Sequence, residues 1–293
     1  MGTTIAIAGG TGALGRRVVA RALTAGWAVR LLTRDPARVP AAVRDRVTPV
    51  VGDGRDRAIA RALIDGVDAL FSCAGASVAV GLGHGWRGFG AVDPVINGAL
   101  IDAARRAPAR PRFVYVGVFH APAMRRLAYV DAHERVAAAL AGSGLPCTVV
   151  RPTGFFSAIV PTYLAMARRG RVPEIGDGRA RTNPIDDDDL ADVCWQAIVD
   201  DRAAATLDVG GPEVMARHRF IELAGAALGR DVDARRLPPW LARAGSAGLR
   251  LVHPRMGQGG AFVAAIATHD LIAPAHGSRR LADAFAAAAA AAR

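Results

Sequence analysis

Two kinds of segment alternate along the chain. Short runs that are almost wholly apolar and rich in β-branched residues recur, and stretches with helical periodicity separate them. A short, nearly unbroken apolar run predicts a strand that is covered on both faces, because a strand with one solvent-facing side alternates apolar and polar positions. The runs that predict strands are residues 4–8, 28–33, 47–51, 68–73, 112–116, 147–151 and 206–209.

The stretches between these runs predict helices that cover a sheet. Strands that alternate with helices are typical of a parallel sheet with helices on both faces. We therefore expect an α/β protein with a Rossmann-type, doubly wound parallel sheet. The predicted helices are residues 13–25, 55–65, 93–106, 123–142, 157–169 and 187–200.

The alternation weakens after about residue 150. Residues 169–185, "RGRVPEIGDGRARTNPI", are rich in turn residues and predict a loop. From residue 212 the pattern is mainly helical, with a helix that starts at "PPW", residues 238–240. The Ala-rich end, "FAAAAAAAR", predicts either a last helix or a frayed tail.

Two parts of unequal regularity follow from this pattern. We expect residues 1–152 to form the cofactor-binding Rossmann core. Residues 153–293 then supply the remaining sheet elements and a small, mainly helical, substrate-binding portion. Because the second part contributes strands to the same sheet, we expect the two to be intertwined as one structural unit.

Composition narrows the class of partner. Hydrophobic residues make up 52% of the chain, which indicates a globular protein. The formal net charge is +11, and all 37 basic residues are Arg, so the positive charge persists at any working pH. These arginines are scattered rather than gathered in a block, which disfavours nucleic acid as a partner. An anionic small molecule, such as a phosphorylated cofactor, is favoured.

Cysteine usage and the ends of the chain point to the cytoplasm. Cys73, Cys147 and Cys194 are far apart and lie in apolar runs, so we expect buried free thiols and no metal site. The chain opens on a strand-like run without a charged leader, which predicts no signal peptide. The apolar stretch near the C-terminus is broken by His269 and Asp270, so no membrane span is expected.

The strongest chemical signal is a glycine-rich turn between the first strand and the first helix. It contains G-x-G-x-x-G at Gly10, Gly12 and Gly15. Gly10 is expected to allow the tight turn, Gly12 the approach of a pyrophosphate, and Gly15 close packing of helix on strand. The pyrophosphate would lie on the free N–H groups of the helix N-terminus. The predicted cofactor residues here are Gly9, Gly10, Thr11, Gly12, Ala13, Leu14 and Gly15.

The end of the second strand bears on the choice of cofactor. An NAD-preferring site has an acidic residue here, but this strand ends at Thr33 and Arg34. A guanidinium suits a 2′-phosphate by charge and by its two-pronged geometry, so NADP(H) is favoured over NAD(H). Asp35, which precedes Pro36, is interpreted as a helix or turn cap.

Two more strand ends contribute cofactor candidates. Asp53, followed by Gly54, either receives the adenine amino group or caps the next helix, and the sequence does not choose between these roles. Ala74, Gly75 and Ala76 follow the fourth strand, and their small size allows the backbone to approach a cofactor or simply makes a tight turn.

In this order, the pieces resemble the short-chain dehydrogenase/reductase superfamily, specifically its atypical, NmrA-like and epimerase-like members. The resemblance covers residues 1 to about 230 and is most specific in the N-terminal half. It rests on "GGTGALG", "LLTRD", "VVGDGRD", "FSCAGASV", "RFVYVGV", "HERVAAALAGSGLPCTVVRPTGFF" and "TNPIDDDDLADV". It implies a Rossmann domain, bound NADP(H) and a small C-terminal substrate-binding portion.

The resemblance also aligns the catalytic positions. "YVDAH" looks like the family's YxxxK motif, with Tyr129 as the proton donor or acceptor and His133 in place of the Lys. The family's Ser or Thr after the fifth strand is missing, and His120 is the candidate that could orient a substrate oxygen instead. Because an unaided phenol is a poor base but a usable acid at neutral pH, reduction survives the loss of Lys better than oxidation. A half-buried helix face without chemistry is the alternative for Tyr129 and His133.

Further candidates lie around the expected nicotinamide position. The resemblance places Val116, Pro152, Thr153 and Phe155 near the nicotinamide. Trp86 and Phe156 are the candidates for substrate contact, with core packing as the alternative for one or both phenylalanines. The glycine-rich segment 75–90, which includes His84, could form a mobile lid. The acidic run "IDDDDL" at 185–190 is interpreted as charge at a helix N-terminus and not as a metal site.

Two functional classes remain open from the sequence. The first is an NADPH-dependent reductase of a small carbonyl compound or an activated double bond, or a related NADP-dependent epimerase or isomerase. The second is an NADP(H)-binding redox sensor or scaffold without turnover. We expect a small-molecule substrate and a monomer or homodimer.

Overall fold

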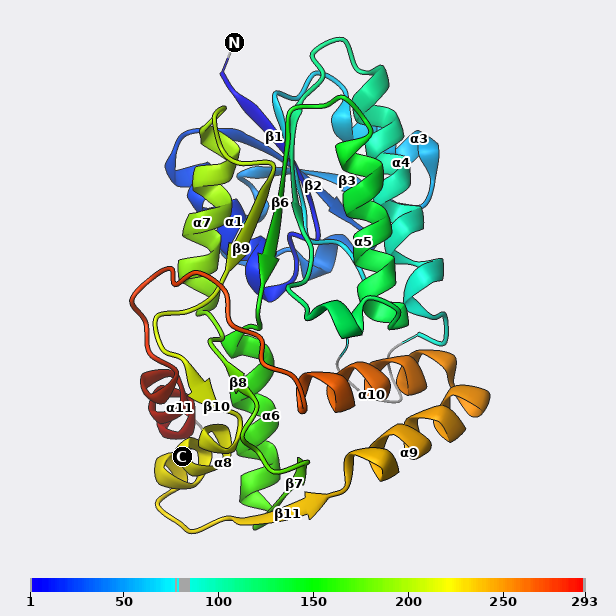
Figure 1. Cartoon of the computed structure of the whole chain (residues 1–293). Coiled ribbons are helices and arrows are strands. Elements are labelled where there is room, and N and C mark those ends of the chain that lie inside the picture. Colours follow the sequence, from blue (N-terminus) through cyan, green and yellow to red (C-terminus); the bar gives the residue numbers. More distant parts are fainter. Residues whose placement is uncertain (1, 77, 79–84, 292–293) are drawn as a thin grey trace.

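A seven-stranded parallel sheet forms the centre of the protein in the computed structural model, which describes residues 2–76, 78 and 85–291 (Figure 1). Its strand order is β3-β2-β1-β4-β5-β6-β9, and every neighbouring pair is parallel. The strands are β1 (Thr4–Ala8), β2 (Ala28–Thr33), β3 (Val47–Val51), β4 (Ala69–Ser72), β5 (Arg112–Val116), β6 (Cys147–Pro152) and β9 (Thr206–Val209). All seven predicted strands and the Rossmann-type α/β fold are thereby confirmed.

Helices cover both faces of this sheet. α1 and α7 pack together on one face, while α3, α4 and α5 form a layer on the other (Figure 1). Buried aliphatic and aromatic side chains fill the space on each side, with Ile5 and Ile7 facing one layer and Ala6 and Ala8 the other. The helices are α1 (Ala13–Thr24), α2 (Ala41–Arg44), α3 (Arg57–Ile64), α4 (Asp93–Arg106), α5 (Ala128–Ala141), α6 (Phe156–Arg168) and α7 (Asp187–Val199).

The strand order creates a topological switch point between β1 and β4. The chain leaves β1 toward β2 and β3 on one side, and returns to β4, β5 and β6 on the other. Ligands of open parallel sheets bind at this switch point, beyond the carboxyl ends of the strands. The turn after β1 and the segment after β4 both lie there, and the Cys73 N–H donates to Ala8 O at 3.0 Å.

The start of α5 and the presence of α2 differ from expectation. α5 begins at Ala128 and not at residue 123, because a separate 3₁₀ turn at Pro122–Met124 precedes it. The short α2 was not predicted, since four residues are too few to show periodicity. The predicted cap at Asp35 is confirmed: its carboxylate accepts the Ala37 N–H at 2.9 Å, at the start of a 3₁₀ turn.

The C-terminal portion is mainly helical, as predicted. Its helices are α8 (His218–Leu228), α9 (Pro239–Val252), α10 (Pro254–Ile266) and α11 (Leu281–Ala290). The Ala-rich end is helical through Ala290, because Leu281 and Phe285 are buried against α6 and α8. Within the described residues, no helix is long and apolar enough to cross a bilayer.

The prediction of a loop over residues 169–185 is wrong in part. β7 (Arg171–Ile175) pairs in parallel with β11 (Asp233–Leu237), and β8 (Arg181–Thr182) pairs antiparallel with β10 (Met215–Ala216). In β7 the buried positions are Val172 and Glu174. Because one of them is acidic, the sequence lacks the alternation of apolar and polar residues that predicts a strand. Glu174 is tolerated because its Oε1 is 2.7 Å from His218 Nδ1.

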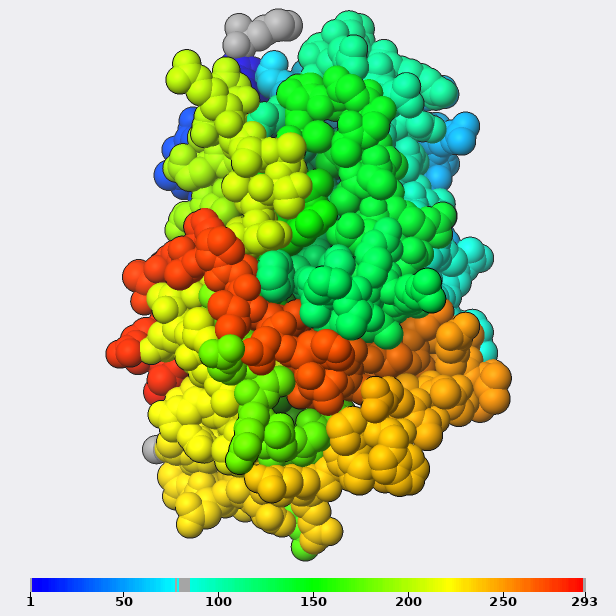
Figure 2. Space-filling view, in the orientation of Figure 1, coloured from blue at the N-terminus to red at the C-terminus, as the bar shows by residue number. Residues whose placement is uncertain are grey.

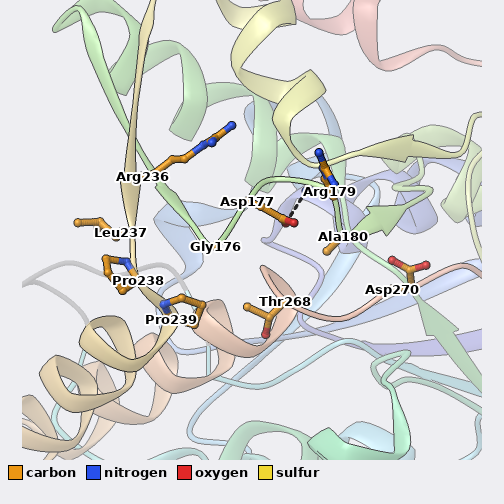
Figure 3. A pocket seen from close by; sticks show the side chains of 10 residues that line it. All are labelled: Gly176, Asp177, Arg179, Ala180, Arg236, Leu237, Pro238, Pro239, Thr268 and Asp270. Carbon is orange, nitrogen blue, oxygen red and sulfur yellow. Dashed lines mark hydrogen bonds between the residues drawn. The ribbon is translucent and has the colours of Figure 1, made fainter.

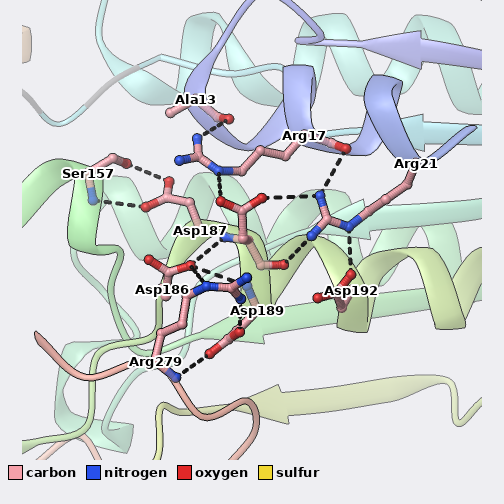
Figure 4. Close-up of polar contacts among 10 residues, drawn as sticks. Ala13, Arg17, Arg21, Ser157, Asp186, Asp187, Asp189, Asp192 and Arg279 are labelled. Carbon is pink, nitrogen blue, oxygen red and sulfur yellow. Dashed lines mark hydrogen bonds and ion pairs between the residues drawn. The ribbon is translucent and has the colours of Figure 1, made fainter. Parts of the chain in front are cut away.

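The acidic run at the start of α7 joins the two parts of the chain (Figure 4). Asp186 caps the helix by accepting the Asp188 N–H at 2.8 Å, which confirms the interpretation of this run as helix N-terminal charge. Asp187 accepts the backbone N–H of Ser157 in α6, Asp188 pairs with Arg17 and Arg21 of α1, and Asp189 holds Arg279. Neighbouring carboxylates thus contact α1, α6 and the C-terminal segment.

The three thiols are free, as predicted, but they differ in burial. Cys194 is fully buried in α7, whereas Cys73 and Cys147 are partly exposed. The exposed part of Cys73 is not its thiol, which faces Gly9 O at 3.6 Å; loss of solvent raises the pKa of this thiol to about 12 and leaves it protonated at neutral pH.

Candidate active site

The glycine turn after β1 has one open position and two packed ones. A Cβ added to Gly10 would lie 2.1 Å from Leu31 Cδ1, and one added to Gly15 would lie 2.2 Å from Gly9 O. A Cβ on Gly12 would meet only Gly9 O, at 3.3 Å. Gly15 therefore allows close packing, as predicted. The tight turn, however, is made by Gly9, whose φ is +89°, and not by Gly10.

The helix that follows this turn has an N-terminus suited to an anion. Gly12, which has no side chain to cap the helix, is the N-cap of α1, and the first turn contains no acidic residue. The first intrahelical bond is donated by Arg16 to Gly12 O at 3.1 Å, so the N–H groups of Ala13 and Leu14 precede the helical ladder. Uncapped N–H groups and the helix dipole fit a pyrophosphate. Thr11 lies in the same turn, half-buried.

The end of β2 offers a positive charge. Thr33 is buried, and its hydroxyl donates to Asp35 O at 2.8 Å, while Arg34 is exposed directly after it. Asp53 lies within electrostatic range of Arg34, and a hydrogen bond from Arg55 lowers the pKa of Asp53 to about 2. The cap of α3 is Asp56, which accepts the Ala58 N–H at 2.7 Å. The alternative that Asp53 caps this helix is therefore wrong.

The segment after β4 is held close to the glycine turn. A Cβ on Gly75 would lie 3.1 Å from the carboxyl carbon of Asp93, and the Ala76 N–H donates to Asp93 Oδ1 at 2.6 Å. Asn97, one turn further along α4, donates to Ala74 O at 3.0 Å and accepts from the Ser72 hydroxyl. Gly54 packs on Leu32, where an added Cβ would lie 2.9 Å from Cδ2.

Tyr129 lies among aromatic rings. Its ring centroid is 4.9 Å from that of Phe89, 4.5 Å from that of Phe262 in α10 and 4.6 Å from that of His133. Loss of solvent raises the pKa of the Tyr129 phenol well above its ordinary value near 10. The phenol is therefore protonated throughout the physiological range.

His133 lies one turn along α5 and is buried. Its Nδ1 is 2.6 Å from the Tyr115 hydroxyl, and its Nε2 is 3.7 Å from Asp93 Oδ2. Burial lowers the pKa of His133 to about 4, so the imidazole is neutral at pH 7. If Tyr115 donates to Nδ1, the imidazole proton is on Nε2 and faces Asp93.

The pKa of Asp93 is shifted in the opposite direction to that of His133. It is 0% exposed at the first residue of α4, and burial raises its pKa to about 7 even though the Ala76 N–H and the charge of Arg255 lower it. Ordinary values are about 3.9 for Asp and about 6.5 for His. Between pH 4 and 6.5 the unfolded chain holds the proton on His133, whereas the folded protein holds it on Asp93.

His120 lies in a different polar cluster. Its Nδ1 is 3.0 Å from Ala121 O, and its Nε2 is 3.6 Å from Glu134 Oε1. Arg151 of β6 reaches the same carboxylate at 3.3 Å. Of the three predicted catalytic residues, Tyr129 and His133 therefore contact each other. His120 instead contacts Glu134, the residue after His133 in α5.

The remaining candidates have different surroundings. The Thr153 hydroxyl donates to Asn183 O at 2.6 Å, Val116 and Pro152 are buried at their strand ends, and Phe155 is the half-buried N-cap of α6. Phe156 packs in the core between α6, α8 and α11, which is the alternative expected for one of the phenylalanines.

Trp86 is 60% exposed, and its ring centroid is 4.7 Å from that of His253. His84 and part of the proposed lid, residues 77 and 79–84, lie outside the described residues.

A separate cavity of about 720 Å³ lies in the C-terminal portion, between the β7–β8 turn and the start of α9 (Figure 3). Two basic side chains, Arg179 and Arg236, and two acidic side chains, Asp177 and Asp270, line it. Its other lining residues are Gly176, Ala180, Leu237, Pro238, Pro239 and Thr268. None of the predicted site residues lines this cavity, which therefore adds a polar hollow outside the predicted site.

Sequence reasoning missed two residues of the site, Asp93 and Tyr115. A signal for Asp93 exists in "DPVIN": Asp93 and Asn97 are polar, four residues apart and on the covered face of a helix. Tyr115 gives no signal, because an aromatic residue in a central strand is ordinary core.

Comparison with known proteins agrees with this geometry. A family model described as NAD(P)H-binding matches residues 9–201. A curated relative, the photosystem II assembly factor Ycf39 of Trieres chinensis, is 22% identical over 239 residues, which are 81% of this chain and 73% of that protein.

Solved structures share the fold at low identity. A nucleoside-diphosphate-sugar epimerase from Staphylococcus aureus superposes with a TM-score of 0.75 at 14% identity, over 97% of this chain and 95% of that one. The NADPH-dependent quinone oxidoreductase QOR2 from Escherichia coli, solved with NADPH, has a TM-score of 0.71 at 20% identity, over 97% and 99%. These likenesses bear on the fold alone.

The opposite pKa shifts of Asp93 and His133 predict how the stability of a variant depends on pH. In the native protein the two shifts cancel in proton count between pH 4 and 6.5, so the pair adds no pH dependence to stability. In Asp93→Asn, His133 alone remains, and the unfolded chain binds the extra proton. The free energy of unfolding should then fall, relative to native protein, by about 1.4 kcal/mol per pH unit as pH decreases from 6.5 toward 4.

Urea unfolding at a series of pH values measures this slope, with the exposed Asp201→Asn as the control. Parallel pH profiles for Asp93→Asn and native protein would show that His133 is not held neutral by burial.

Proposed function

The chain belongs to the NAD(P)H-binding family, and from this premise we propose that it is an NADPH-dependent reductase of a small carbonyl compound or an activated double bond. The observation that carries the proposal is the Tyr129 phenol, which burial keeps protonated beside a neutral His133. A group held in its acid form can donate a proton but serves poorly as a base.

The residues around the β1 and β2 ends fit the cofactor. The open face of Gly12 and the uncapped start of α1 suit the pyrophosphate, while Arg34 suits a 2′-phosphate. In the proposed reaction, bound NADPH would supply the hydride. The short segment 74–76, which Asp93 and Asn97 hold in place, follows β4 at the same end of the sheet.

Tyr129 is the proposed proton donor. Its hydroxyl would protonate the substrate oxygen as negative charge develops there, and the surrounding rings of Phe89 and Phe262 exclude water from that position. His133 is a positioning residue in this scheme, because its ring packs edge-on against Tyr129 and carries no charge that would promote phenolate. His120, which pairs with Glu134, is a candidate for orienting the substrate oxygen.

The same geometry disfavours the other enzymatic reading. Epimerisation through an oxidised intermediate needs a base that removes a hydroxyl proton, and a phenol of raised pKa is unsuited to that step. A sensor or scaffold remains the second candidate. It is favoured by the enclosure of Tyr129 among three rings and by the likeness to a named assembly factor.

Isotope transfer distinguishes the reductase from the sensor. With NADPH deuterated at the nicotinamide C4 in either stereochemical form, and a metabolite extract of the native cell, a deuterated product is expected by mass spectrometry. Tyr129→Phe should reduce its formation about 100-fold or more, because the proton donor is lost. Tyr163→Phe, which removes a hydroxyl from α6 in the C-terminal portion, is the matched control.

Equal label transfer by native protein and Tyr129→Phe would contradict the assigned role of Tyr129. No transfer from any carbonyl or enone in a defined panel, despite NADPH binding, would favour the sensor.

The cofactor preference has its own test. Arg34→Asp should weaken NADPH binding about 10- to 100-fold, because a charge-assisted contact to the 2′-phosphate becomes a repulsion, and should leave NADH binding little changed. Dissociation constants from nucleotide fluorescence measure both. Arg38→Asp, in the neighbouring 3₁₀ turn, is the control. An unchanged ratio of the two constants would rule out Arg34 as the phosphate ligand.

A further inference from the structure

α9 exposes its apolar side chains instead of burying them. No residue of this helix is buried, and its main packing partner is α10. Leu251 is 88% exposed, Val252 67%, Trp240 65% and Leu241 46%. In an ordinary surface helix the apolar stripe faces the core, so the usual orientation is reversed here.

Close packing explains how α9 sits. A Cβ added to Gly257 of α10 would lie 2.4 Å from Arg250 Cα, and one added to Gly260 would lie 2.7 Å from Ser246 Oγ. Ala242 and Ser246, the half-buried positions, therefore mark the side that faces α10. With 3.6 residues per turn, Trp240, Leu241, Leu251 and Val252 lie on the opposite side, and Leu249 lies nearer to α10.

The outward face is continuous along the helix. Helical spacing aligns Trp240, Ala244, Ala247 and Leu251, with Leu241 and Val252 beside them. Figure 2 shows α9 in golden yellow to light orange along the lower right edge of the molecule, next to the deeper orange of α10. A contiguous apolar strip on a protruding helix marks an interaction site, unlike single exposed apolar residues, which are normal.

The charged side chains of the segment that contains α9 are all positive. Residues 234–269 contain five arginines and no Asp or Glu. Arg243 and Arg250 are exposed, seven residues apart, and so lie along one edge of the apolar face. A helix with Trp and Leu on one face, Arg along its edge and no acidic residue has the composition of an interfacial membrane helix.

A second copy of the chain fits this surface less well. A two-fold contact through α9 would bring Arg243 and Arg250 near their own counterparts, between two chains that each carry a net charge of +11. Anionic lipid instead complements the arginines, and a lipid headgroup layer accommodates a protruding helix without a matching groove.

We propose that α9 binds the surface of an anionic lipid membrane, with Trp240, Leu241, Leu251 and Val252 in the headgroup–acyl boundary and Arg243 and Arg250 on lipid phosphates. The helix lies along the surface and does not cross it. An indole ring, apolar with a polar N–H, suits that boundary, and each arginine adds attraction that salt screens. This assignment is independent of the chemistry at Tyr129.

Co-sedimentation of the whole protein with vesicles tests the proposal. Binding is expected to vesicles of phosphatidylcholine mixed with phosphatidylglycerol, to weaken with added salt, and to be weak on phosphatidylcholine alone. The double variant Trp240→Ser/Leu251→Ser should bind the mixed vesicles about tenfold or more weakly, and Arg243→Gln/Arg250→Gln about tenfold more weakly.

Two matched controls separate this face from general stickiness. Val199→Ser/Val214→Ser removes two exposed apolar side chains elsewhere, and Arg105→Gln/Arg106→Gln removes two exposed charges at the end of α4. Both should bind like native protein. Circular dichroism and thermal melting confirm that each variant is folded.

Three results would overturn the proposal. Native protein that stays in the supernatant with mixed vesicles shows that the face is not a lipid-binding surface. Equal losses in the α9 variants and the controls show that net charge alone drives the binding. A dimer in light scattering that Trp240→Ser/Leu251→Ser dissociates, without vesicle binding by native protein, assigns the face to a second copy.

Discussion

The arrangement around Tyr129 depends on one buried carboxyl group. Asp93 is fully enclosed at the start of α4, where one oxygen takes the Ala76 N–H and the other faces His133 at 3.7 Å. Two opposite charges in this position would each lose their hydration, and one salt contact of that length does not compensate for the loss. Below about pH 7 the proton therefore lies on Asp93, and His133 is neutral. The same carboxyl holds the segment 74–76, a proposed cofactor contact, so under the proposed function one residue connects cofactor binding to the state of the imidazole.

The neutral histidine determines which chemistry the site favours. A lysine at this position would place a positive charge beside the phenol and lower its pKa, as the resemblance to the reductase superfamily implies. Here Tyr129 is enclosed by aromatic and aliphatic side chains, with no cation beside it among the described residues, and its pKa rises instead. The substitution of His for Lys thus removes a positive charge that would favour phenolate. In the proposed reaction, the protonated phenol still serves as the proton donor for reduction.

Local sequence patterns predicted the central sheet and the glycine turn after β1. The elements and residues that they did not predict depend on contacts with residues distant in the sequence. Unbroken apolar runs identified all seven central strands, and the glycine spacing identified the packed Gly15 and the open Gly12. β7 escaped because its inward Glu174 depends on His218, which is distant in sequence. The role of Asp53 was open because Asp56, three residues on, is an equally good cap. Asp93 and Tyr115 could not be identified from the sequence, because their contacts with His133 form only when α4, β5 and α5 pack together.

Measuring the protonation state of His133 tests most directly the claim that burial keeps this imidazole neutral beside Tyr129. Nitrogen-15 NMR of the imidazole reports separately whether Nδ1 and Nε2 carry a proton. We predict neutral imidazole shifts for His133 from pH 8 down to about pH 5, since burial lowers its pKa to about 4. Imidazolium shifts at pH 6 to 7 would contradict the account, because a charged His133 beside an ionised Asp93 would stabilise phenolate and reopen oxidative or epimerase chemistry at Tyr129.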